Sequence, residues 1–248
     1  MFYELTIALR TIRQEGFKPL LEKISLYFRQ LGWGLQFLNL PLPHGKPPEE
    51  VLHFCFDTAG DLIGPSQIHS EILALARLVK ERKPKVVVEI GTAKGGTLCI
   101  LCCVAEPTAT VISIDLPGGV HGGGYPRWRS IIYRRFAQPK QSLHLLRLDS
   151  HLTSTLDQLK AVLPAGGIDL LFLDGDHTYA GVKQDFEMYS PLVRRGGLVV
   201  FHDICVHPPE YNCQVDEYWQ EVRKQYKSWE YVENPKQGMY GIGVVELA

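Results

Sequence analysis

Two short clusters of acidic and histidine side chains are the part of the chain most suited to chemistry. Asp174 and His177 follow one apolar run, and His202 with Asp203 follows a second. Carboxylates can hold a divalent cation, and an imidazole can accept a proton. Each residue alone is more often a cap or a hydrogen-bonded core group. Two such clusters after apolar runs favour a catalytic site.

Both apolar runs have the composition of buried strands in a parallel sheet. The carboxyl ends of neighbouring parallel strands meet at one edge of a sheet, where open α/β sheets bind ligands. We therefore expect Asp174 and Asp203 to bind a divalent cation, with His202 as an additional ligand. Asp174 is also expected to take part in catalysis. His177 is expected to accept a proton as general base.

The stretch 85–97 joins a buried strand to a ligand-binding loop. Residues 86–90 are mostly β-branched and apolar, which is typical of a strand covered on both faces. Gly91 and Gly95 can adopt positive φ and let a ligand approach the backbone closely. Ala93 stands where the dinucleotide motif G-x-G-x-x-G has its second glycine, and no G-K-[ST] follows. Dinucleotide and nucleoside triphosphate sites are therefore disfavoured.

Two further strands are expected to end in polar residues. Residues 110–115 form a strand whose Asp115 either accepts hydrogen bonds from both ribose hydroxyls of a nucleoside or caps the next turn. Residues 143–148 form another, followed by Asp149 and Ser150, which either contact an adenine ring or cap a turn. Together these strands predict an adenosine-type ligand.

Composition limits the class of protein. The chain has 248 residues, 45% of them hydrophobic, which suits one large domain with an appendage. The formal net charge of -1 does not point to nucleic acid and is compatible with a small, roughly neutral substrate. The six cysteines have neither the density of a disulfide scaffold nor paired zinc motifs, so a reducing cytoplasm is expected.

The N-terminal part differs from the rest of the chain. Residues 1–40 predict an extension of two amphipathic helices, broken near Gly16. Charged residues interrupt the apolar runs, so neither a signal peptide nor a spanning helix is expected. The extension either packs on the domain or on another subunit, or lies on a membrane surface. Proline-rich residues 41–64 predict a linker before a domain over 65–248.

Two local features complete the domain. A helix is expected to begin at Pro65 with Ser66 as its N-cap. The glycine-dense segment 116–125 is expected to form a lid over the site. Arginines after this segment, among them Arg129, either recognise an anionic substrate or lie on a solvent-exposed face.

Residues 65–246 resemble class I S-adenosylmethionine-dependent methyltransferases, in the group that includes cephalosporin-biosynthesis proteins and macrolide-sugar O-methyltransferases. The resemblance implies a Rossmann-like, doubly wound, mostly parallel sheet of seven strands that ends in an antiparallel hairpin. The motifs stand in family order: Glu89 to Gly95, Asp115, Asp149 to His151, Asp174 to His177, and Phe201 to Asp203. The cofactor-binding residues it implies are Glu89, Gly91, Thr92, Lys94, Gly95, Asp115, Asp149, Ser150 and Asp174.

The resemblance also implies the chemistry of the site. Metal-dependent members bind magnesium through an aspartate after the fourth strand and an acidic pair after the fifth, and a nearby histidine acts as base. Asp174, Asp203 and His177 stand at those positions. His202 departs from the acidic pattern, which leaves magnesium, a softer divalent ion and no metal as alternatives.

The function expected from these features is transfer of a methyl group from S-adenosylmethionine to a hydroxyl. The acceptor expected is a sugar or another small polyhydroxylated metabolite, in surface-polysaccharide or natural-product biosynthesis. One alternative is an oxidoreductase or hydroxylase-type protein with an adenosine cofactor, which Ala93 disfavours. The other is a non-catalytic cofactor-binding module in an assembly complex, with the N-terminal helices as its main working part.

Overall fold

A computed structural model describes residues 21, 25, 29, 32–118 and 124–248. The chain forms two compact units, Met1–Pro41 and Leu42–Ala248. In the first unit residues 32–37 are helical, while most of the expected amphipathic extension over 1–40 lies outside the described residues. Among the described residues, no helix is both long and apolar enough to cross a membrane.

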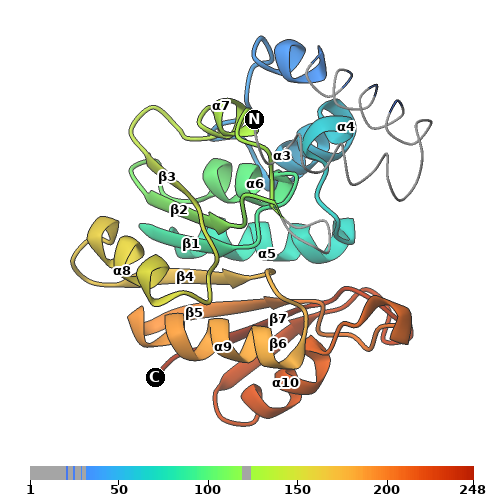
Figure 1. Ribbon diagram of the computed structural model, residues 1–248, viewed down its shortest axis with the longest axis vertical. Helices are drawn as coiled ribbons and strands as arrows, with labels where there is room; N and C mark the ends of the chain where they lie inside the picture. The colour runs from blue at the N-terminus through green and yellow to red at the C-terminus, as the bar shows by residue number, and fades with distance from the viewer. Residues whose placement is uncertain (1–20, 22–24, 26–28, 30–31, 119–123) are drawn as a thin grey trace. The chain divides into compact units, whose positions relative to one another are not determined.

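Seven strands of the described residues form one sheet in the second unit (Figure 1). Their order is β3-β2-β1-β4-β5-β7-β6. The first five strands pair in parallel, and β7 pairs antiparallel with both β5 and β6. This confirms the predicted doubly wound, Rossmann-like sheet with a C-terminal antiparallel hairpin. The strands are β1 Val86–Ile90, β2 Thr110–Asp115, β3 Ser142–Arg147, β4 Ile168–Leu173, β5 Val193–His202, β6 Lys227–Tyr231 and β7 Ile242–Glu246.

Helices cover the sheet and connect its strands (Figure 1). In the second unit the α-helices are α3 Pro48–His53, α4 Gly60–Ile63, α5 His69–Arg82, α6 Gly96–Val104, α7 Arg129–Tyr133, α8 Thr153–Val162, α9 Tyr179–Tyr189 and α10 Val215–Val222. The described residues also form a π-helical turn, Phe54–Thr58, and two 3-10 turns, Ser190–Leu192 and Pro209–Tyr211.

The core explains why the central strands are apolar throughout. All of β1 is buried, because helices pack on both faces of a parallel sheet. On one face Val88 and Phe201 lie in a single apolar cluster with Phe186 of α9 and Trp219 of α10. Side chains alternate along a strand, so the intervening residues point to the other face. There α5 packs on α6 and contacts β6 and β7.

The expectation of a linker over residues 41–64 is wrong for residues 48–63. This stretch forms α3, the π-helical turn and α4, and it buries Val51, Leu52 and Ile63. Pro48 stands in the first turn of α3, where a missing N–H costs no hydrogen bond, so proline there does not break the helix. His44 Nε2 also lies 3.0 Å from the backbone oxygen of Phe136. The folded domain therefore begins well before residue 65.

Two smaller expectations are also corrected. Helix α5 begins at His69 and has no side-chain cap, so Ser66 is not its N-cap. Arg129 is neither solvent-exposed nor available to a substrate, because it is buried and its Nη1 donates to the backbone oxygens of Leu62 and Lys94, at 2.8 and 3.3 Å. Of the expected lid, residues 119–123 lie outside the described part of the chain.

Candidate active site

The site lies where the sheet changes direction, between β1 and β4. The chain runs from β1 outward to β2 and β3, then crosses to β4 and β5 on the other side. Loops at this switch point separate and leave a crevice at the carboxyl ends of the strands. Gly91 has φ of +90°, and a Cβ there would lie 1.9 Å from the backbone oxygen of Asp174. Only glycine lets these two strand ends approach so closely.

The loop after β1 is held in shape from several sides. Gly95 has φ of +88°, and a Cβ there would lie 2.7 Å from the Tyr133 ring. The Tyr133 hydroxyl in turn donates to the backbone oxygen of Ala93, at 2.8 Å. Gly96 has ordinary φ but needs to be small, since its Cβ would lie 2.2 Å from the oxygen of Ile63. Glycine is therefore required in this loop both for the positive φ of Gly95 and because a Cβ would clash with neighbouring atoms.

Glu89 is the buried acid beneath this loop. Its Oε2 accepts a hydrogen bond from the Thr92 hydroxyl at 2.7 Å, and Ser113 Oγ lies 2.5 Å from the same hydroxyl. Burial raises the pKa of Glu89 well above its usual range, and the Thr92 hydrogen bond offsets this only in part. The other oxygen, Oε1, is buried without a hydrogen-bond partner among the described residues. It is a polar atom that a ligand in the crevice can satisfy.

Asp115 stands at the end of β2, as predicted, and it supports the glycine loop. Its Oδ2 accepts from the backbone N–H groups of Thr92 and Ala93, at 3.1 and 2.7 Å, and its Oδ1 accepts from Leu116 at 2.7 Å. Burial raises the pKa of Asp115, and these N–H groups counteract the rise. The capping role left open by the sequence is therefore present. Recognition of a ribose would be a second role of the same carboxylate.

Asp149 and Ser150 follow β3 in a turn. Asp149 Oδ1 accepts from the backbone N–H of His151 at 2.9 Å, a turn that aspartate commonly stabilises. The Tyr189 hydroxyl donates to the backbone oxygen of Ser150 at 2.6 Å. His151 Nε2 lies 3.4 Å from Asp185 Oδ1 on α9. These contacts hold the turn at the same edge of the sheet as the glycine loop. Lys94, a predicted cofactor-binding residue of that loop, is exposed.

The two predicted clusters come together in a closed ring of alternating acids and imidazoles. Asp174 Oδ1 lies 3.0 Å from His202 Nδ1 and 3.4 Å from His177 Nε2. Asp203 Oδ2 lies 3.3 Å from the same His202 nitrogen and 3.4 Å from His177 Nδ1. His202 and Asp203 are nearly covered, whereas the His177 side chain is 42% exposed. His177 is therefore the member of the ring that can meet an acceptor.

The backbone of Asp203 explains how two consecutive residues reach one place. Neighbouring side chains of a strand point to opposite faces. β5 ends at His202, and Asp203 has φ of +63°, a left-handed conformation that is uncommon outside glycine. This turn brings both side chains to the same ring. Strained residues of this kind cluster at functional sites.

Electrostatic interactions within the ring favour the charged forms of its histidines and aspartates. Burial alone lowers the pKa of His202, but the carboxylates of Asp174 and Asp203 outweigh it and raise the pKa well above the usual range. Burial likewise lowers the pKa of His177, and Asp174 and Asp203 again produce a net rise. The pKa of each carboxyl is correspondingly lowered, because the imidazoles outweigh the effect of burial. A cation can replace the protons that these groups share.

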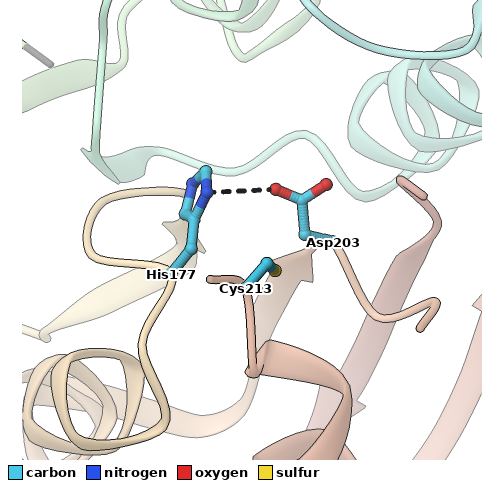
Figure 2. A group of neighbouring side chains, drawn as sticks. All are labelled: His177, Asp203 and Cys213. Atoms are coloured by element: carbon cyan, nitrogen blue, oxygen red, sulfur yellow. Dashed lines mark ion pairs between the residues drawn. The ribbon is translucent and has the colours of Figure 1, made fainter. Parts of the chain in front are cut away.

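Two residues of the site were missed by the sequence analysis. His207 Nε2 lies 3.1 Å from Asp203 Oδ1, and its Nδ1 donates to the backbone oxygen of Cys205 at 2.8 Å. Cys213, which precedes α10, lies beside His177 and Asp203 (Figure 2). Both stand in the irregular connection between β5 and α10, which contains two consecutive prolines. In the sequence, the only indication that His207 belongs to the site was its position four residues after Asp203.

The ring also contains the donor set expected for a metal. One donor atom each from Asp174, His202 and Asp203 lies within 4.8 Å of the others. Two carboxylates and an imidazole suit manganese, iron or zinc better than magnesium, which prefers oxygen alone. The residues present therefore fit a divalent cation. The His202 nitrogen that faces both carboxylates is Nδ1.

A protein-family comparison matches the central part of the chain. Residues 88–204, from β1 to the loop after β5, match a protein family described as "Methyltransferase domain". Residues 88–204 are therefore similar to methyltransferase domains. The glycine loop, Asp115, Asp174 and the ring of acids and imidazoles all lie within the matched residues.

A curated relative that is longer than this chain is similar to part of it. The uncharacterised protein y4gI of Sinorhizobium fredii is 30% identical over 149 residues. The match covers 58% of this chain but only 16% of the relative's length. The similarity therefore concerns only a small part of the relative.

Solved structures share this fold. One is an O-methyltransferase of Bacillus cereus in complex with SAH, with TM-score 0.52 and 18% identity, covering 88% of this chain and 100% of that one. Another is the O-methyltransferase TomG of Streptomyces achromogenes, involved in tomaymycin synthesis and in complex with SAM, with TM-score 0.52 and 17% identity, covering 88% and 99%. At these identities the likeness establishes the fold.

Proposed function

We propose that this protein transfers a methyl group from S-adenosylmethionine to a hydroxyl of a small molecule. The proposal rests on one observation. The glycine loop after β1 lies against the ring of acids and imidazoles, at the adjacent carboxyl ends of β1 and β4. Gly91 of the loop touches the backbone of Asp174, a member of the ring. A cofactor held by the loop and an acceptor held by the ring would therefore be neighbours, as group transfer requires.

The cofactor would be held by residues at the ends of β1 to β4. Glu89 Oε1 and the backbone around Gly91 and Gly95 would receive its amino-acid end. Asp115 would accept from the ribose, and the turn of Asp149 and Ser150 would contact the adenine. Supporting observations are the unpartnered Glu89 Oε1 and the left-handed loop glycines. Two structurally similar proteins carry SAH or SAM.

The chemistry needs alignment and a base. S-adenosylmethionine supplies a methyl group already activated on a positively charged sulfur. An O–CH3 bond forms as the S–CH3 bond breaks, and the hydroxyl proton passes to a nitrogen of His177. Asp174 and Asp203 orient the imidazole and stabilise its protonated form.

A divalent cation would be held by Asp174, His202 and Asp203. When bound, such an ion lowers the pKa of a hydroxyl that coordinates it. The two carboxylates and the imidazole supply the ligands, and His207 holds Asp203 from its other side. His177 remains the exposed group that takes the proton.

The acceptor we propose is a sugar or another small polyhydroxylated metabolite of surface-polysaccharide or natural-product biosynthesis. An alkyl hydroxyl is weakly acidic, so it needs the base and cation that the ring can provide. The structurally similar TomG is itself an O-methyltransferase of tomaymycin synthesis. The direct test is transfer of labelled methyl from S-adenosylmethionine to a panel of nucleotide sugars, free sugars and catechols. Labelling of catechols but no sugar would contradict the acceptor class.

Asp115 offers a test of the cofactor site. Replacing Asp115 by Ala should weaken S-adenosylmethionine binding by about 1–3 kcal/mol in calorimetry, because buried hydrogen bonds to the ribose and to the loop are lost. The Asp115→Asn variant keeps one acceptor oxygen and should lose less. NAD serves as the comparison ligand. Binding of NAD without any heat from S-adenosylmethionine or its demethylated product would refute the cofactor assignment.

Truncation tests the division of the chain. We propose that residues 1–40 serve assembly or membrane location, so a protein starting at Leu42 should keep cofactor binding and change its oligomeric mass or its binding to lipid vesicles. A protein starting at Pro65 should be far less stable. It loses buried side chains such as Val51, Leu52 and Ile63, each worth roughly 1.5–3 kcal/mol. Equal thermal stability of the two truncated proteins would contradict this boundary.

A further inference from the structure

A second set of metal donors overlaps the proposed catalytic ring. His177, Asp203 and Cys213 come from the loop after β4, the end of β5 and the segment before α10. One donor atom of each lies within 4.8 Å of the others. Figure 2 shows the three side chains converging, with the His177 to Asp203 contact drawn. Imidazole, carboxylate and thiolate together are the ligand types of zinc sites.

The backbone fixes Cys213 beside His177. The N–H of Gln214, the next residue, donates to the backbone oxygen of His177 at 2.8 Å. The side-chain oxygen of Gln214 accepts from the backbone N–H of Tyr179 at 3.4 Å. These two bonds tie the segment before α10 to the loop that carries His177. The thiol is thus positioned by the fold rather than by chance proximity.

The two donor sets differ in the ions they select. Asp174, His202 and Asp203 offer two oxygens and one nitrogen, whereas the second set contains a sulfur. Thiolate ligands select soft ions such as zinc over magnesium and manganese. Three protein ligands leave a coordination position open, as in zinc sites that exchange their remaining ligand. The 42% exposure of the His177 side chain gives an ion access.

We propose that His177, Asp203 and Cys213 form a binding site for a thiophilic divalent cation such as zinc, and that its occupation inhibits the enzyme. The inhibitory part rests on the function proposed above. An ion bound to the His177 imidazole makes it a weaker base for the hydroxyl proton, and it draws Asp203 away from the first donor set. Because Asp203 belongs to both sets, the two ions compete for it.

Cobalt titration of the metal-free, full-length protein tests the site without any assay of activity. Cobalt bound by a thiolate shows a sulfur-to-metal charge-transfer band, which zinc should displace. The band should appear in the wild type and in Cys205→Ser, the matched control for a cysteine outside the donor set, and vanish in Cys213→Ser. No band in the wild type, or an unchanged band in Cys213→Ser, would overturn the proposal.

A second measurement uses the wild type, so that its result does not depend on whether Cys213→Ser folds. Zinc should protect Cys213, but not Cys205, from alkylation, as peptide mapping can show. Equal alkylation of Cys213 with and without zinc contradicts the site.

Activity forms a separate arm of the test. Cys213→Ser should raise the zinc concentration that gives half inhibition by at least about 10- to 100-fold, since even loss of an outer-shell partner commonly costs that much affinity. Inhibition unchanged by this substitution would overturn the regulatory part. A cobalt band without methyl transfer to any acceptor would refute the proposed function and leave the metal site intact.

Discussion

Replacing His177 by alanine is expected to lower the rate of methyl transfer by about a hundredfold or more, as removal of a general base typically does. Both ring nitrogens lie 3.4 Å from a carboxylate, and the side chain is exposed enough to reach an acceptor. Single-turnover transfer of labelled methyl measures the effect. Binding of S-adenosylmethionine should change little, because the glycine loop does not depend on His177. An unaltered rate would mean that the ring is structural.

The rate of methyl transfer should depend on pH through the protonation of His177. The carboxylates of Asp174 and Asp203 outweigh burial and raise the pKa of His177 above its usual value of about 6.5. A general base acts in its neutral form, so the rate should fall as the pH drops through this raised pKa. Asp174→Asn removes one negative charge and should move the fall to lower pH. His53→Ala, which alters an exposed histidine paired with Asp57, should leave its position unchanged.

Removal of divalent cations is expected to lower turnover by about a hundredfold or more, because a metal at a developing oxyanion contributes several kcal/mol. Cofactor binding should stay nearly intact after treatment with a chelator. Manganese should restore the activity more fully than magnesium, whereas zinc should not restore it because it also occupies the donor set of His177, Asp203 and Cys213. Asp203→Asn should be inactive under all these conditions, since Asp203 belongs to the donor set.

The matched control for Asp203→Asn is Asp176→Asn. Asp176 lies in the loop of the ring, but its Oδ1 accepts from the backbone N–H of Thr178 and it belongs to neither donor set. This variant should respond to chelator and to added manganese as the wild type does. Activity that survives chelation but still requires His177 would establish a metal-free base mechanism.

The parallel strands and the polar residues at their ends could be predicted from the sequence. Residues 86–90 are apolar without interruption because both faces of β1 are buried, and the glycines that follow mark a turn that only small residues permit. Asp115, Asp174 and Asp203 each follow such a run. The carboxyl ends of parallel strands share one edge, so their convergence followed from the fold class.

Local sequence by itself determined which segments are strands, where the loop glycines stand and which edge of the sheet carries the site. Only the tertiary structure decided that Asp203 turns through positive φ, that Cys213 lies beside His177, and that residues 48–63 pack on the domain. The physical reason is the range of the interactions. Strand and glycine signals act between neighbours in the chain, whereas these placements depend on hydrogen bonds and packing between distant segments, which no local pattern records.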